Sequence, residues 1–260
     1  METRKQLALR GTILVLLLFT LTGFGFPSGE ESPRILAMKE VLRLTDESGE
    51  FSFRYPGQIK TTADGNLFVA DEEALFHFDS SGRYLGNLVR KGEGPGEVKY
   101  FMGYSLDDGK IYIKSSSPTK ILIFTGTHQL ESEIRIDGIT FFSDYLFSLR
   151  DWHYFFEGND DIRALNTGKY QNEFVLLSVD SRGQVDRSEL KFRVPIAVHK
   201  SGNHVRGTGI AYLNKVFDGS RYLYVSHEER YAVYKVDLAS RKIVNTMRRS
   251  FSPVPYRPRK

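Results

Sequence analysis

A short strand, a polar turn and a second strand recur four times along this chain. The apolar residue that precedes the turn is Phe78, Phe124, Val179 or Val236, so the copies follow one another at steps of 46, 55 and 57 residues. A single hairpin cannot bury its apolar face alone. A hairpin that recurs at this period therefore predicts a series of similar sheets that pack on one another.

The unit that begins at Tyr55 is the clearest copy. Residues 57–62 are typical of an extended segment, and Asp64-Gly65-Asn66 is typical of a tight turn that needs glycine at positive φ. Residues 67–71 then form an apolar strand, and two further strand patterns follow at 75–78 and 84–89. Four strands in about 40 residues are the pattern of one β-propeller blade.

Two other units repeat this pattern, and one departs from it. Asp108-Gly109 precedes the strand pattern at 111–113, and Asp218-Gly219 precedes the one at 222–225. The third unit has a clear strand at 174–177, but residues 150–170 before it read as an insertion. The sequence thus predicts three regular units and one irregular unit.

Two motifs resemble those of a known family. Asp-Gly-Asn-Leu-Phe-Val-Ala-Asp at 64–71, followed by Phe-Asp-x-x-Gly at 78–82, resembles NHL-type repeats. Gly-Glu-Gly-Pro-Gly-Glu at 92–97 is similar to the linkers that join blades in such propellers. The chain therefore resembles the exported six-bladed β-propeller proteins of bacteria. The resemblance implies an all-β fold of the six-bladed NHL-like type, with about four blades recognisable in this chain.

The predicted organisation has three parts. We expect a signal peptide at 1–25, a lead-in with a first strand (35–44) at 26–50, and a propeller domain at 51–260. The predicted blades lie approximately at 51–97, 98–137, 138–200 and 201–252. Six blades of about 40–45 residues need roughly 240–270 residues, so four blades predict a propeller that is incomplete at its C-terminus.

The N-terminus has the pattern of an export signal. Arg4, Lys5 and Arg10 precede an uncharged apolar run at 11–26 that contains small residues for cleavage near Gly25. The run is short for a membrane span of about 20 residues, although an uncleaved N-terminal anchor is an alternative. We therefore expect a periplasmic or extracellular protein, with no span beyond this segment.

Composition excludes several kinds of chemistry. The chain has no cysteine, which excludes disulfides, thiolate metal sites and a cysteine nucleophile. The formal charge of +4 comes from Lys and Arg that are mixed with Asp and Glu, which is typical of a solvated surface and not of a nucleic-acid interface. No serine-hydrolase, penicillin-binding or kinase motif appears, so no catalytic residue is predicted.

Recurrent polar residues have structural interpretations. No two of the six histidines have the spacing of a zinc motif, so no metal site is predicted. Asp79, Asp180 and Asp237 stand before turns, where we expect them to accept hydrogen bonds from turn amides. The 92–97 segment lacks a Gly-Lys-Ser/Thr ending, and Pro95 removes an N–H donor, so we interpret it as a linker and not as a phosphate loop.

One local cluster is a weak candidate for ligand binding. Arg150, Trp152 and His153 include the only tryptophan and precede a segment that departs from the repeat. Loops inserted into a rigid scaffold often carry function, and these residue types suit a binding pocket. The alternative is that Trp152 and Phe155 merely cover a sheet edge.

Three functions stay open at this point. The first is a non-enzymatic extracytoplasmic binding module or scaffold for a protein, peptide or glycan, with no cofactor. The alternative is a metal-dependent propeller hydrolase or lyase with a site in the central channel, where oxygen ligands would suit Ca²⁺. A third is a subunit of a larger extracytoplasmic assembly.

Overall fold

The computed structural model describes residues 39–47, 49–140, 143–158, 165–202, 204–209, 213–227 and 230–250. The chain divides into two units, residues 1–41 and 42–260. Of the first unit only 39–41 are described, and they form no regular secondary structure. The predicted signal peptide and residues 251–260 lie outside the described part. Among the described residues, no helix has the length and apolar character needed to cross a membrane.

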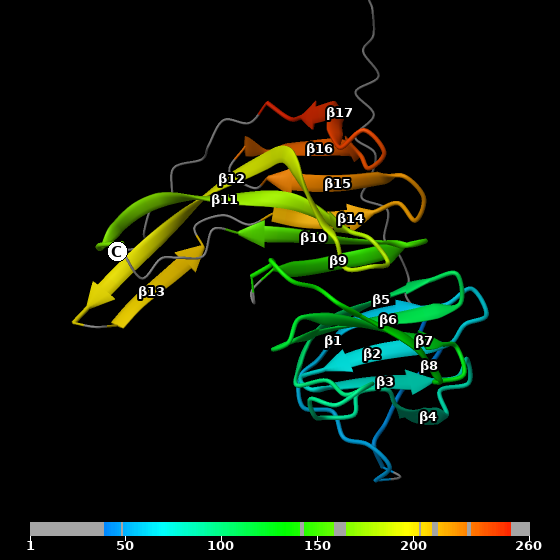
Figure 1. The fold of residues 1–260 in the computed structure, drawn as a ribbon. Coiled ribbons are helices and arrows are strands. Elements are labelled where there is room, and N and C mark those ends of the chain that lie inside the picture. The colour runs from blue at the N-terminus through cyan, green and yellow to red at the C-terminus, as the bar shows by residue number, and fades with distance from the viewer. Residues whose placement is uncertain are drawn as a thin grey trace, which may run out of the picture. The chain divides into compact units, whose positions relative to one another are not determined.

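The second unit contains four antiparallel sheets (Figure 1). Sheet 1 consists of β1 (Pro56–Thr61), β2 (Leu67–Asp71), β3 (Ala74–Phe78) and β4 (Tyr84–Asn87). Sheet 2 consists of β5 (Tyr100–Asp107), β6 (Lys110–Ser116), β7 (Lys120–Thr125) and β8 (Leu130–Arg135). Sheet 3 consists of β9 (Asp144–Leu149), β10 (Trp152–Gly158), β11 (Gly168–Val179), β12 (Val185–Ser201) and β13 (His204–Gly209). Sheet 4 consists of β14 (Leu213–Phe217), β15 (Tyr222–His227), β16 (Ala232–Asp237) and β17 (Lys242–Arg248).

Tight turns join the first two strands of sheets 1, 2 and 4, as the Asp-Gly pairs predicted. Gly65, Gly109 and Gly219 have φ of +87°, +70° and +84°, a region that residues with a Cβ adopt at a cost. The strands of each sheet are paired in sequence order, which is typical of antiparallel sheets built from successive hairpins.

Aspartates organise other turns as expected. Asp79 Oδ1 accepts hydrogen bonds from the backbone N–H groups of Ser81 and Arg83, both at 3.0 Å. Asp180 Oδ1 does the same for residues 182 and 184 in the β11–β12 turn, both at 2.9 Å. These carboxylates therefore replace backbone acceptors that a tight turn lacks.

Apolar side chains from adjacent sheets form the cores. Phe68 and Leu75 of sheet 1 share a buried cluster with Ile111, Ile113 and other residues of sheet 2. Similar clusters lie between sheets 2 and 3 and between sheets 3 and 4. Residues of the predicted strands 67–71, 111–113 and 222–225 are buried, namely Val69, Ile111, Ile113, Leu223 and Val225, while Leu67 is partly buried.

The other face of sheet 1 is covered by the segment that precedes β1. Phe51 and Phe53 lie against Phe76 and Phe78, with ring centroids between 5.0 and 6.2 Å apart. Leu44 packs on the same cluster. Residues 39–44 form no strand, so the strand expected at 35–44 is not seen in its described part. Leu44, Phe51 and Phe53 contribute apolar side chains to the sheet face and no backbone ladder.

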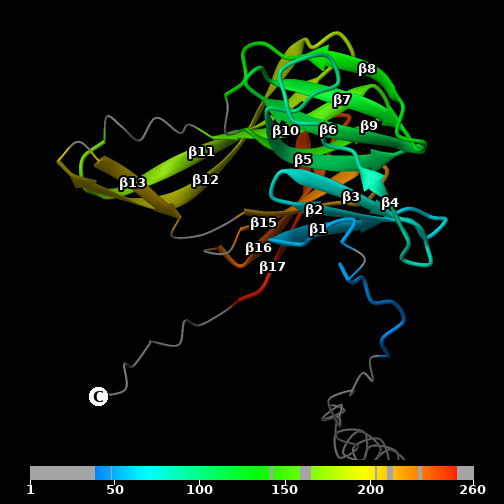
Figure 2. The ribbon, with the colours of Figure 1, turned by 90° about the horizontal axis from the view of Figure 1, so that it is seen from below.

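Sheet 3 differs from the other sheets. Residues 152–158, which the sequence placed in an insertion, are the strand β10, because the aromatic run from Trp152 to Phe156 suits a central strand. The real departure lies further on, where β12 has 17 residues. Its C-terminal half pairs with the start of β11 and with β13, which forms an extension beyond β9 and β10 (Figures 1 and 2). Sheet 3 thus ends at Gly209 and not at the predicted boundary of 200.

Candidate functional site

A cavity of about 740 Å³ lies between sheets 1 and 2. Its volume falls within the range of about 300–1,000 Å³ that is common for small-ligand sites. The turns β1–β2 and β5–β6, together with the strand ends beside them, contribute most of its lining, and β3 and the β7–β8 turn contribute one residue each. The site is therefore built from turns that are held in place by two packed sheets, as in many binding proteins.

Three carboxylates line this cavity, namely Asp64, Asp107 and Asp108. Asp64 Oδ2 accepts a hydrogen bond from Asn66 Nδ2 at 2.7 Å. Asp107 Oδ2 accepts one from the backbone N–H of Arg150 at 2.9 Å. Among the described residues, nothing forms a hydrogen bond or ion pair with the exposed carboxylate of Asp108.

Lys110 is the only cationic side chain among the described residues of the lining. Its Nζ lies 2.8 Å from Glu131 Oε1, and this contact raises the pKa of Lys110. The positive charge is thus already compensated by Glu131. The cavity as a whole is acidic.

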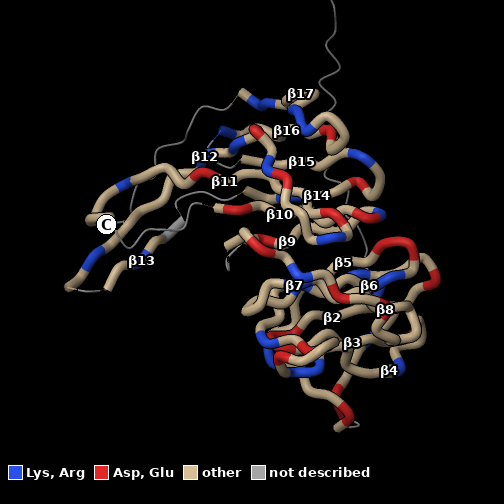
Figure 3. The backbone as a smooth tube through the Cα atoms, in the orientation of Figure 1, with Lys and Arg blue, Asp and Glu red and all other residues tan. Residues whose placement is uncertain are grey.

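The acidic character follows from the repeat. The turn between the first two strands carries an aspartate in all four sheets, namely Asp64, Asp108, Asp151 and Asp218. Figure 3 shows acidic segments at the turns beside β5 and β6. Asp218 has a structural role, since its Oδ1 accepts three turn N–H groups and these bonds lower its pKa to about 2. Asp64 and Asp108 make no such set of turn bonds.

A histidine pair joins the two sheets next to the cavity. His77 Nδ1 on β3 lies 2.5 Å from His128 Nε2 in the β7–β8 turn. The ring of His77 also stacks on Phe68, with centroids 4.1 Å apart and planes at 11°. His77 is 3% exposed, whereas His128 is half-buried. One nitrogen of this contact must donate a proton and the other must accept it. The contact is therefore stable when both rings are neutral or when only one of them is charged, and it is lost when both rings are charged.

The second ring nitrogen of His77 has no protein partner. Nε2 is buried and makes no hydrogen bond, although the residue lines the cavity. Burial, and next the proximity of His128, lower the pKa of His77 to about 4. His77 is therefore neutral near pH 7, and its Nε2 is a buried polar atom without a hydrogen-bond partner among the described residues.

The three residues predicted to bind ligand do not form one site. Arg150 lies in the exposed β9–β10 turn with φ of +55°, and Trp152 is 40% exposed at the start of β10. His153 is 1% exposed and points between sheets 2 and 3. None of the three lines the acidic cavity, but the backbone N–H of Arg150 binds its carboxylate Asp107. A ligand role for these side chains stays a prediction.

His153 belongs to a buried polar network. Its Nδ1 lies 2.6 Å from Ser148 Oγ, which lies 2.6 Å from the hydroxyl of Tyr145. That hydroxyl is in turn 2.6 Å from Ser105 Oγ on β5. Burial lowers the pKa of His153 to about 4. The network links sheets 2 and 3.

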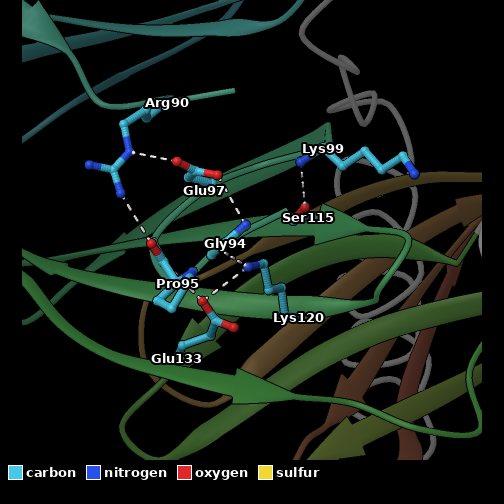
Figure 4. A network of polar contacts seen from close by, with 9 residues as sticks. Arg90, Gly94, Pro95, Glu97, Lys99, Ser115, Lys120 and Glu133 are labelled. Carbon is cyan, nitrogen blue, oxygen red and sulfur yellow. Dashed lines mark hydrogen bonds and ion pairs between the residues drawn. The ribbon is translucent and has the colours of Figure 1, made fainter. Parts of the chain in front are cut away.

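The 92–97 linker is closed to anions, as the sequence predicted. Gly94 N donates to Glu97 Oε2 at 3.0 Å, and Gly96 N donates to Glu133 Oε2 at 3.1 Å. Lys120 Nζ binds the carbonyl oxygen of Gly94 at 3.1 Å (Figure 4). The amides that could hold a phosphate are thus already bonded to carboxylates of the protein.

The described residues bring no three His, Asp or Glu side chains together in a way that could hold a metal ion.

The residues that line the cavity are not among those predicted to bind a ligand. A signal for Asp64 and Asp108 was present, because both precede the glycine of an equivalent turn and must lie at the same edge of adjacent sheets. His77 stands in the apolar strand 75–78, where a buried polar group needs a partner. No sequence signal joins it to His128, which is 51 residues away.

Comparison with known proteins identifies the fold. A family described as a 6-bladed beta-propeller matches residues 40–249. The chain belongs to this family. Its four sheets are therefore blades of a six-bladed β-propeller, which confirms the fold class that the repeat predicted. No curated protein matches the sequence.

Solved propeller structures are similar at low identity. A candidate exported protein of Bacteroides fragilis is 13% identical with a TM-score of 0.44, over 77% of this chain and 73% of its own. A protein of unknown function from Bacteroides caccae is 11% identical with a TM-score of 0.46, over 74% of this chain and 60% of its own. Virginiamycin B lyase from Staphylococcus aureus is 11% identical with a TM-score of 0.42, over 74% and 69%. At these identities the likeness carries no information on ligand or activity.

Proposed function

We propose that this protein is an exported, non-enzymatic β-propeller binding module that holds a protein, peptide or glycan ligand in the cavity between blades 1 and 2. The observation that supports this most is the cavity of about 740 Å³ itself. It combines a size suited to a ligand with polar groups that converge from several turns.

The construction of the cavity favours a preformed site. Buried residues of β2 and β6, among them Phe68 and Ile111, hold the two sheets together below it. Asp107 is oriented by the backbone of the neighbouring β9–β10 turn. A ligand would therefore meet polar groups already in position, which lowers the entropic cost of binding.

Export is supported by the N-terminal sequence. Arg4, Lys5 and Arg10 before the apolar run 11–26 match the order of charge and hydrophobicity in a signal peptide. Mass spectrometry of the protein from the periplasmic fraction tests this. We expect a mature N-terminus near Gly25, and recovery of peptides that contain Met1 would contradict it.

Arrays of peptides and glycans test the binding role. The wild-type protein and the double variant Asp64→Asn, Asp108→Asn would be applied in parallel, with Glu189→Gln as a control that removes one exposed carboxylate from β12. We expect a set of ligands that the wild type and Glu189→Gln bind and the double variant loses. Identical patterns for all three proteins would contradict a ligand site in the cavity.

A further inference from the structure

We propose that the cavity between blades 1 and 2 recognises a positively charged N–H donor, the ammonium or guanidinium group of a Lys or Arg side chain on a peptide or protein. This inference rests on the proposed binding function and narrows it. It is carried by two independent observations, the acidic lining and the unpartnered nitrogen of a buried histidine.

The charge balance of the lining excludes an anionic ligand. Asp64, Asp107 and Asp108 carry three negative charges, and the charge of Lys110 is compensated by Glu131 at 2.8 Å. A phosphate or carboxylate would meet net repulsion there. A cation would instead find Asp108 at an exposed turn and Asp64 in the adjacent blade. Asp108 acts on Lys110 through its charge, but it forms no hydrogen bond or ion pair with the described residues.

His77 adds a specific acceptor. The ring is 3% exposed, its Nδ1 bonds His128, and its Nε2 has no partner. When Nδ1 carries the proton and donates to His128, Nε2 presents a lone pair. A donor from the ligand would satisfy this buried atom, which otherwise costs the protein a hydrogen bond.

The ring content of the cavity favours a cation over a sugar. Phe68 is the only Phe, Tyr or Trp that the described part of the chain places in the lining, and it is 2% exposed because His77 covers it. A saccharide therefore has no open aromatic face to stack on. Three carboxylates and a neutral imidazole are hydrogen-bond acceptors, and the charged donor Lys110 is already paired with Glu131. Such a set of acceptors suits an ammonium or guanidinium group, which carries several N–H bonds.

Calorimetric titration of the full chain at low salt tests the inference. The probes are Nα-acetyl-arginine methylamide, Nα-acetyl-lysine methylamide and the citrulline analogue, which is a neutral isostere of arginine. We expect at least one cationic probe to bind, and citrulline to bind about tenfold or more weakly, since loss of the charge removes charge-assisted bonds.

Variants localise the effect. Asp64→Asn with Asp108→Asn should weaken binding of the cation by about tenfold or more, while Glu189→Gln should leave it unchanged. Asp108→Asn alone is the second variant, since its exposed side chain has no structural partner that the fold needs. Circular dichroism and thermal melting check that each variant is folded.

The outcomes separate this inference from the proposed function. Equal binding of citrulline and arginine derivatives, no binding of either cation, or binding that Asp108→Asn leaves unchanged would overturn the cation inference. If the arrays still show neutral ligands that the double variant loses, the binding role stands and only the ligand class is wrong. If no array ligand distinguishes the double variant from the wild type, the binding role fails as well.

Discussion

Lys120 Nζ lies 3.0 Å from Glu133 Oε2, and this pair also holds the linker between blades 1 and 2. The lysine side chain is 1% exposed, and the carboxylate accepts a further hydrogen bond from Gly96 N. A buried charge that loses its partner costs far more than an exposed one. The pair is thus the electrostatic contact on which the position of this linker depends most.

Removal of the carboxylate should therefore destabilise the fold. We expect Glu133→Gln to lower the free energy of unfolding by about 2–4 kcal/mol, because Lys120 stays buried without its counter-ion. Glu131→Gln on the same strand is the matched control, since its pair with Lys110 is exposed and is worth less than about 1 kcal/mol. Urea denaturation of both variants measures the difference. Equal losses would show that the buried pair has no special role.

A charge placed in the core of blade 1 should strongly destabilise the fold. Val69 is 1% exposed and packs with Phe76 and Phe78. We expect Val69→Asp to cost more than about 3 kcal/mol, since an unpaired carboxylate would enter an apolar layer. Val216→Asp is the control, because that valine is 65% exposed. A melting temperature of the Val69 variant within a few degrees of that control would contradict the packing.

A comparison of Gly183 with Gly219 separates the energetic cost of a steric clash from the cost of a side chain at positive φ. Its φ is +82°, and a Cβ there would meet the carbonyl oxygen of Arg135 well inside van der Waals distance. Gly219 has nearly the same φ, +84°, with open space around it. We expect Gly219→Ala to cost about 1 kcal/mol and Gly183→Ala at least about 2 kcal/mol more. Similar losses for the two alanines in chemical denaturation would refute the close approach.

Lys114 should make stability depend on pH in the alkaline range. It is fully buried and its Nζ donates to the carbonyl oxygen of Ser143, and burial lowers its pKa from 10.5 to about 8. Between these two values the unfolded chain holds the proton and the folded chain does not. The unfolded state therefore binds more protons there, and stability rises with pH.

The difference in unfolding free energy between the wild type and Lys114→Met isolates this effect. We expect the wild type to gain on the order of 2 kcal/mol relative to the variant as the pH rises from 8 to 10.5. A difference that is constant across this range, or that falls, would show that Lys114 keeps its proton in the folded protein.

The repeat predicted the parts of the fold that depend on local sequence. The residues at 67–71 and 111–113 are strands because each is a short apolar run that directly follows an Asp-Gly turn. The irregular unit was harder to predict. Trp152 to Phe156 are a similar apolar run, but Arg150-Asp151 precedes them and no Asp-Gly turn marks the start of the strand β10.

The candidate site could be predicted only in part. Equivalent turns place Asp64 and Asp108 at one edge, which the sequence shows. The contact between His77 and His128 depends on the orientation in which blade 2 packs on blade 1. No pattern within either hairpin predicts that orientation. The cavity itself is a space between two sheets, so its shape depends on how the sheets pack and is not encoded by either sheet alone.

Imidazole ¹⁵N shifts, followed during titration with Nα-acetyl-arginine methylamide, test the central claim most directly. His153 Nε2 and His227 Nδ1 are also buried without partners but lie away from the cavity lining, so they are internal controls. We predict that His77 Nε2 shifts in a saturable way while those two nitrogens do not. Unchanged shifts at His77 up to saturation, or equal shifts at all three histidines, would contradict a ligand site beside His77.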